Sequence, residues 1–148
     1  MRATLLLLLL VAFAGCGGDG GPSIEGYRDE ANDICATATR DAAAVTPPAD
    51  SAESVAAYSE AVGEVRSREA VALSELEPPS ELEKSHELLV NASGAIVRSL
   101  ADLTSAAGRG DQTAAQAAAT AGARAAAQAR RAANELGLDS CGKPGAPR

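Results

Sequence analysis

The feature that most limits the fold is a helical repeat of apolar residues, which appears four times along the 148-residue chain. In each segment apolar side chains recur every three or four positions, and no stretch shows the alternation typical of a β-strand. Proline pairs at 47–48 and 78–79, and glycines at 108 and 110, separate the segments. The pattern therefore predicts four amphipathic helices, at about 23–45, 51–76, 80–107 and 111–136.

The ends of these helices carry their own signals. Ser80 and Glu83 have the spacing of a capping box, which predicts that the third helix begins directly after Ser80. Gly137 followed by Leu138 predicts that the fourth helix ends in a Schellman motif. Capping residues also precede the second and the fourth helix, namely Asp50 or Ser51, and Asp111.

The repeat also predicts which face of each helix is buried. The expected inward residues of the first and second helices are Ile24, Tyr27, Ala31, Ile34, Cys35, Ala38 and Val45, and then Val55, Tyr58, Val62, Val65, Ala72 and Leu76. Those of the third and fourth are Leu82, His86, Leu89, Ser93, Ile96, Leu100, Leu103 and Ala107, and then Ala115, Ala118, Gly122, Ala125, Ala129 and Ala133. The small residues of the fourth helix allow close approach but bury little area each.

Short connections make consecutive helices antiparallel neighbours. We therefore expect residues 23–142 to form an all-α, antiparallel up-down-up-down four-helix bundle that is rich in alanine. In this topology the end of the fourth helix returns beside the start of the first. Residues 143–148 are expected to form a disordered tail.

Composition predicts a thin core and excludes one class of partner. Only nine Leu, seven Val and three Ile follow residue 15, and the only aromatic residues there are Tyr27 and Tyr58. The formal net charge is −7, and the chain has no basic cluster that could neutralise a phosphate backbone. We therefore expect no nucleic-acid partner.

Residues 1–15 have the form of an export signal. Arg2 supplies a positive start, and the apolar run that follows is shorter than the ~20 residues that span a bilayer. The run ends at Gly15-Cys16, which resembles a bacterial lipobox, in which the cysteine sulfur receives a diacylglyceryl group and the cysteine becomes the mature N-terminus. Phe13 departs from the leucine usual in a lipobox, and the alternative is an ordinary secretory signal with a coincidental cysteine.

This pattern leads us to expect a lipid on Cys16 and attachment to the extracytoplasmic face of the cell membrane. Residues 16–22 are rich in glycine and are expected to form a flexible tether. As a random coil such a tether spans roughly 13 Å. The domain would then lie close to the membrane surface.

The remaining cysteines, Cys35 and Cys141, form an even pair in a compartment that permits disulfides. Cys35 on its apolar helical face is also compatible with a small buried hydrophobic residue. Cys141 lies in a tail rich in glycine and proline, where nothing else predicts burial. We therefore expect a disulfide between the two.

Few residues carry a chemical signal. His86, the only histidine, has no His or Cys partner at helical spacing, so it is expected to be structural or exposed rather than a metal ligand or a catalytic base. Glu69 interrupts the apolar stripe of the second helix, so it is the one carboxylate whose position allows partial burial and a shifted pKa. The commoner alternative is a residue at the edge of the buried face that reaches out to water or pairs with a nearby Arg. No phosphate loop, nucleophile elbow or paired catalytic set is present. We expect no enzymatic activity, no cofactor and no metal.

One family resemblance rests on short segments near the two cysteines of the domain. They are Tyr27, Ala31-Asn32, Ile34-Cys35-Ala36, Leu136-Gly137-Leu138 and Cys141-Gly142. With the lipobox, these segments resemble those of small actinobacterial envelope lipoproteins of unknown function. The resemblance implies a cell-envelope location and a helical fold, and it supplies no activity.

The expected function is that of a lipid-anchored, non-enzymatic component of the cell envelope that binds a partner or has a structural role. Its contacts are expected to be the membrane, through the N-terminal lipid, and an envelope protein. The alternative is a module that binds a solute or a lipid in a cavity between its helices, for which the many Ala and Gly positions leave space.

Overall fold

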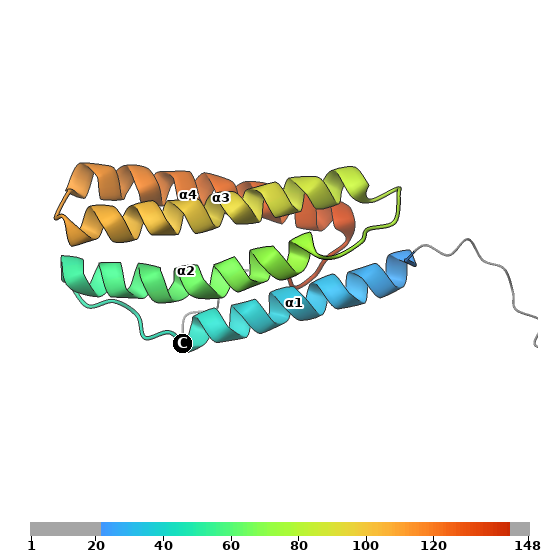
Figure 1. Cartoon of the computed structure of the whole chain (residues 1–148), viewed down its shortest axis with the longest axis horizontal. Helices are drawn as coiled ribbons and strands as arrows, with labels where there is room; N and C mark the ends of the chain where they lie inside the picture. Colours follow the sequence, from blue (N-terminus) through green and yellow to red (C-terminus); the bar gives the residue numbers. More distant parts are fainter. Residues whose placement is uncertain (1–21, 143–148) are drawn as a thin grey trace, which may run out of the picture.

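The structure of the chain is a computed structural model that describes residues 22–142. These residues form four helices and no strand: α1 (Ile24–Ala44), α2 (Ala52–Ser74), α3 (Glu83–Gly108) and α4 (Gln112–Leu136). Figure 1 shows that consecutive helices run in opposite directions and are joined at alternate ends. The predicted all-α, up-down-up-down bundle is confirmed. The predicted signal (1–15), Cys16 with the rest of the tether to residue 21, and the tail (143–148) lie outside the described residues.

Side-chain caps begin three of the helices, because their oxygens accept a hydrogen bond from an otherwise unpaired backbone N–H of the first turn. The sequence offered both Asp50 and Ser51 as the N-cap of α2, and in the structure the cap is Ser51. The three bonds are Gly26 N to Ser23 Oγ at 3.0 Å, Ser54 N to Ser51 Oγ at 3.1 Å, and Ala114 N to Asp111 Oδ1 at 3.0 Å.

The start of α3 differs from the prediction. The capping box of Ser80 and Glu83 does not form, and the helix begins at Glu83 with Leu82 at the N-cap and no side-chain cap. Residues 79–82 instead form a tight turn, in which the N–H of Leu82 donates to the carbonyl of Pro79 at 2.8 Å. The turn lets Leu82 pack against the core, and this tertiary contact outweighs the local capping signal.

The end of α4 follows the prediction closely. Gly137 adopts the left-handed conformation, with φ of 73°, and its N–H donates to Asn134 O at 3.1 Å. The N–H of Leu138 donates to Ala133 O at 2.8 Å, which completes a Schellman motif. Leu138 is buried, so the chain turns back across the bundle at this point.

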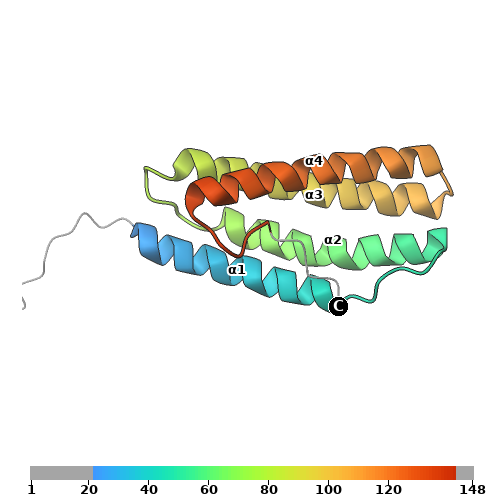
Figure 2. The same ribbon diagram turned by 180° about the vertical axis from the view of Figure 1, so that it is seen from behind.

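The helices do not pack equally. The longest contact is between α3 and α4, followed by that between α2 and α3, whereas α1 contacts α2 over a shorter stretch. A β-carbon at Gly122 would lie 2.7 Å from Ser99 Oγ, so a larger residue at this close approach of α4 to α3 would force Ser99 to shift. Figures 1 and 2 show that α1 stops well short of the level where α2 begins. One end of the bundle therefore has four helices and the other has three.

The core lies at the four-helix end, where α1 begins and α4 ends. Its largest completely buried side chains are Leu73, Leu89 and Leu136, and alanine supplies most of the rest. Tyr27, Ala31 and Cys35 of α1 also belong to it. As the composition predicted, this core is thin.

The buried face of α2 was predicted correctly only at Val65. Its other buried residues are Ser59, Glu69 and Leu73, whereas the predicted Val55, Tyr58, Val62, Ala72 and Leu76 are only half-buried. α2 lies between α1 and α3, so the line facing both of them is the one that is buried, and the apolar stripe flanks it. Ile24, also predicted to face inward, is 38% exposed at the first turn of α1.

Candidate binding cavity beside the disulfide

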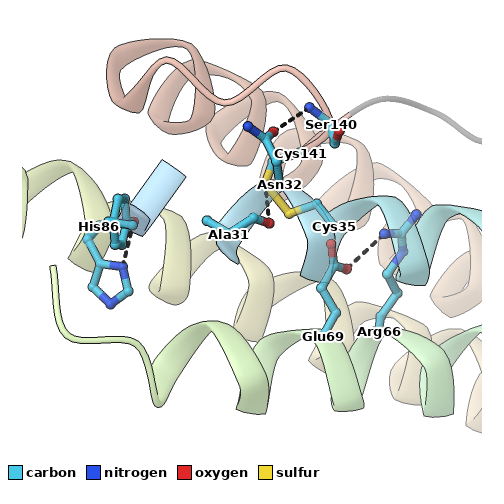
Figure 3. The surroundings of a disulfide bond; sticks show 9 residues. Ala31, Asn32, Cys35, Arg66, Glu69, His86, Ser140 and Cys141 are labelled. Atoms are coloured by element: carbon cyan, nitrogen blue, oxygen red, sulfur yellow. Dashed lines mark hydrogen bonds and ion pairs between the residues drawn. A yellow bond between two sulfur atoms is a disulfide. The ribbon is translucent and has the colours of Figure 1, made fainter. Parts of the chain in front are cut away.

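The disulfide joins α1 to the segment that follows α4. Cys35 and Cys141 are bonded with an S–S distance of 2.08 Å and a Cα–Cα distance of 4.9 Å, across 106 positions of sequence. Both side chains are buried, at 1% and 6% exposure. The predicted pairing is confirmed, and Figure 3 shows its surroundings.

Residues 136–141 also bind to α1 over successive helical turns. Arg28 Nε donates to the carbonyl of Leu136 at 2.7 Å, and the N–H of Ser140 donates to Asn32 Oδ1 at 2.9 Å. Cys141 Sγ, which carries no hydrogen in a disulfide, lies 3.6 Å from the carbonyl oxygen of Ala31. The start of α1 is thus attached to the end of α4 by covalent and polar contacts rather than by a large helix interface.

A cavity of about 170 Å³ lies next to this disulfide, with walls from all four helices. Leu89, Ile96, Ala126 and Ala129 form much of its apolar wall. The alanines of α4 are too small to fill the space between α3 and the disulfide. The cavity is therefore a consequence of the small side chains of α4, of which Ala129 was predicted to face inward and Ala126 was not.

Glu69 lies at the wall of this cavity, and its side chain is only 9% exposed. Arg66 Nη1 donates to Glu69 Oε2 at 2.8 Å, which is the only ion pair among residues 22–142. The sequence left burial of Glu69 and its pairing with a nearby Arg as alternatives, and the structure has both. Its other oxygen, Oε1, accepts no hydrogen bond from the described residues.

Ser93 is a second polar residue at the cavity wall, and it is 7% exposed. Ser59 and Ser99 are buried to a similar degree, and each donates to a carbonyl of its own helix, at 2.7 and 2.8 Å. The hydroxyl of Ser93 has no such bond within residues 22–142, where every side-chain oxygen or nitrogen shielded from solvent has a partner. Its oxygen is therefore open to solvent, and Ser93 is one of the residues that line the cavity.

Glu69 and Ser93 lie at the same level of the bundle. A β-carbon at Gly63 would be 3.7 Å from Leu100 Cβ, which fixes the register of α2 against α3. Because the two helices are antiparallel, six residues further along α2 corresponds to six residues back along α3. This register places Glu69 beside residue 94, next to Ser93.

A shallower groove lies on the other side of Glu69, between α1 and α2. It has a volume of about 410 Å³, and its apolar wall includes Ile34, Ala38 and Val65. Asp33 and Asp41 of α1 lie along one edge, and Arg68 of α2 lies along the other. Glu69 lines both the groove and the cavity, so it forms part of the wall between them.

His86 occupies a buried site away from the cavity. It is 8% exposed, and its Nδ1 shares a hydrogen bond of 2.9 Å with the hydroxyl of Tyr27, which is 3% exposed. The two rings meet edge to face, with centroids 5.7 Å apart. Burial lowers the pKa of His86 and raises the pKa of Tyr27. The sequence placed both residues on inward faces but gave no sign that they would be partners.

Within residues 22–142 no three His, Cys, Asp or Glu side chains are grouped as a metal site would need. None of the four helices is both long enough and apolar enough to cross a membrane. Comparison of the chain with protein-family models, with curated proteins and with solved structures finds no match.

Proposed function

We propose that the chain is a lipid-anchored, non-enzymatic binding module of the cell envelope, and that it holds a small ligand in the cavity beside the disulfide. The observation that carries the proposal is a pair of nearly buried polar side chains, Glu69 and Ser93, which line this cavity and each have an oxygen without a hydrogen-bond partner among residues 22–142. Every side-chain oxygen or nitrogen of residues 22–142 that is shielded from solvent has a partner, so these two oxygens are open to solvent and free to bond to a ligand. Unused capacity at a cavity is what a ligand site requires.

The cavity itself supports the same proposal. Empty space in a core lowers stability, and the thin core of this chain has little stability to lose. A larger side chain at Ala126 or Ala129 would occupy the space. A bundle with a purely structural role would gain from such a residue.

The location in the proposal rests on the sequence. Residues 1–15 and the lipobox cysteine, Cys16, support export and lipidation, as does the resemblance to actinobacterial envelope lipoproteins. A disulfide between buried cysteines agrees with an exported domain, because thiols are kept reduced in the cytosol.

A surface that binds an envelope protein is the second candidate. The charge distribution favours it, since residues 50–77 carry seven acidic and two basic side chains, whereas residues 109–136 carry four basic and two acidic ones. Such asymmetry steers a charged partner, and the attraction weakens as the salt concentration rises.

Thermal unfolding of the mature chain, residues 16–148 with Cys16→Ser, separates the two candidates. A ligand in the cavity raises the melting temperature in a saturable manner with little dependence on salt. Ala126→Leu should abolish this effect by filling the cavity, whereas Ala127→Leu at the neighbouring position, which does not line the cavity, should preserve it. Stabilisation that disappears in high salt and is unchanged by Ala126→Leu would instead favour the second candidate, a surface that binds an envelope protein.

A further inference from the structure

The polar groups of the cavity define what its ligand must offer. Glu69 Oε1 is a carboxylate oxygen and can only accept hydrogen bonds, so the ligand must carry an O–H or N–H donor. The hydroxyl of Ser93 can both donate and accept. Both residues line the same cavity at one level of α2 and α3, so the polar group of the ligand is expected at this level.

The charges at the cavity disfavour a cationic ligand, and the carboxylate oxygen of Glu69 disfavours an anionic one. The negative charge of Glu69 is already balanced by Arg66 at 2.8 Å, so the pair as a whole attracts no further cation. Arg130 also lines the cavity, and its side chain is exposed, which adds positive rather than negative charge at the rim. A cationic ligand would therefore be desolvated without gaining a free opposite charge.

The size and the walls of the cavity determine the size and the apolar character of the rest of the ligand. Its volume of about 170 Å³ compares with the ~150 Å³ of an engineered protein cavity that binds benzene. Leu89, Ile96 and the buried disulfide present apolar surface to the remaining part of the molecule. The ligand is thus small and mostly apolar, with its polar group at one end.

We infer that the cavity binds a small neutral molecule consisting of an apolar frame with one hydroxyl group, of the size of phenol. The hydroxyl donates to Glu69 Oε1 and accepts from the hydroxyl of Ser93, and the frame lies against Leu89, Ile96 and the disulfide. This assignment rests on the proposed function, because it names the class of ligand for the same cavity.

Phenol and benzene form the matched pair of probes, because they share a ring and differ by the hydroxyl. Binding to the mature chain is measured by calorimetry and by chemical-shift changes in NMR spectra. Phenol should bind about tenfold to a hundredfold more tightly than benzene, because each of its two added hydrogen bonds contributes about threefold to tenfold. Cyclohexylammonium, a cation of similar size, should bind more weakly than phenol.

Two substitutions test the contacts. Ser93→Ala and Glu69→Gln should each weaken phenol binding by about threefold to tenfold and leave benzene binding unchanged. Ser99→Ala is the matched control, because Ser99 is equally buried in α3 but donates to the carbonyl of Ile96 and does not line the cavity. If Glu69→Gln prevents folding by leaving Arg66 unpaired, Ser93→Ala still decides the question.

The outcomes separate the inference from the proposed function. Equal binding of phenol and benzene, or tighter binding of cyclohexylammonium, would overturn the inferred class of ligand and leave the cavity as a ligand site. If none of the three probes binds, and Ala126→Leu raises stability with no other effect, the cavity holds water alone. That result would overturn both the inferred class of ligand and the proposed function of the cavity as a ligand site.

Discussion

The hydroxyl of Tyr27 and Nδ1 of His86 lie 2.9 Å apart, and this bond joins the first turn of α1 to the first turn of α3. Neither residue is close to the other in sequence, and each is almost completely buried. The bond fixes α1 at the four-helix end, where its other attachments are the contacts with residues 136–141. Protonation of His86 at Nδ1 therefore changes the hydrogen bond that attaches α1 to α3.

The stability of the protein should fall in mildly acidic solution because of His86. Burial lowers the pKa of His86 below its ordinary value of 6.5, so the unfolded chain binds the proton more readily than the folded chain. The stability that depends on neutral His86 is complete above pH 6.5 and is lost as the pH falls through the folded pKa. Urea unfolding at a series of pH values should show this loss, and His86→Gln should flatten the curve in that range. Equal pH dependence of stability in the unmodified protein and in His86→Gln would show that His86 is not the group responsible.

Removing the disulfide should destabilise the domain strongly. It closes a loop across 106 positions, and the chain-entropy model gives about 4 to 5 kcal/mol for a loop of this length. For a domain of this size, the melting temperature should fall by on the order of 15 °C. Calorimetry with and without reductant, and of the variant with both Cys35→Ala and Cys141→Ala, measures the effect. Free thiols at both positions in natively exported protein would contradict the pairing.

Gly137→Ala should destabilise the domain by about 1 to 2 kcal/mol, because a residue with a β-carbon is strained in the left-handed conformation. The new β-carbon would also lie 3.1 Å from the guanidinium of Arg28 and disturb its bond to Leu136. Gly108→Ala is the control, because a β-carbon there meets nothing within 4 Å and φ is not positive. Chemical unfolding of the two variants should show a loss for the first and no loss for the second. The opposite order would show that the turn after α4 does not depend on glycine.

The N-terminus of the mature protein should be Cys16 carrying lipid. Two acyl chains hold a protein firmly on a membrane, whereas one alone gives only marginal binding. The protein should therefore resist extraction by salt and by carbonate, and Cys16→Ser should release it. Mass spectrometry of the N-terminal peptide provides the direct measurement. An unmodified N-terminus at any other residue would rule out the lipobox assignment.

Most of the fold could be predicted because its signals are local. The four helices follow from apolar periodicity and from the proline and glycine residues between them, and the end of α4 follows from Gly137 and Leu138. The start of α3 could not be predicted in the same way. There Leu82 packs against the core, and the turn that this packing needs delays the helix past the capping signal of Ser80.

The candidate site could be predicted only in part. Glu69 stood out because a carboxylate interrupts an apolar stripe, and this position is indeed buried beside an arginine. Ser93 was placed on the inward face of α3, but sequence does not reveal whether a serine hydroxyl bonds to its own helix or faces a cavity. The cavity depends on the register of α2 against α3 and on the small side chains of α4, which no local pattern encodes.

The disulfide determines how the domain responds to mechanical tension. Cys35 and Cys141 close a covalent ring that contains α2, α3, α4 and the second half of α1. A pull between residue 22 and residue 142 can lengthen only residues 22–34, because every later residue up to Cys141 is bypassed by the sulfur bridge. Stretching therefore peels Tyr27 from His86 and Arg28 from Leu136, while the polypeptide beyond Cys35 bears no load. The load passes the cavity only at its disulfide wall, because Cys35 and Cys141 carry the pull whereas the cavity residues of α2, α3 and α4 lie inside the ring.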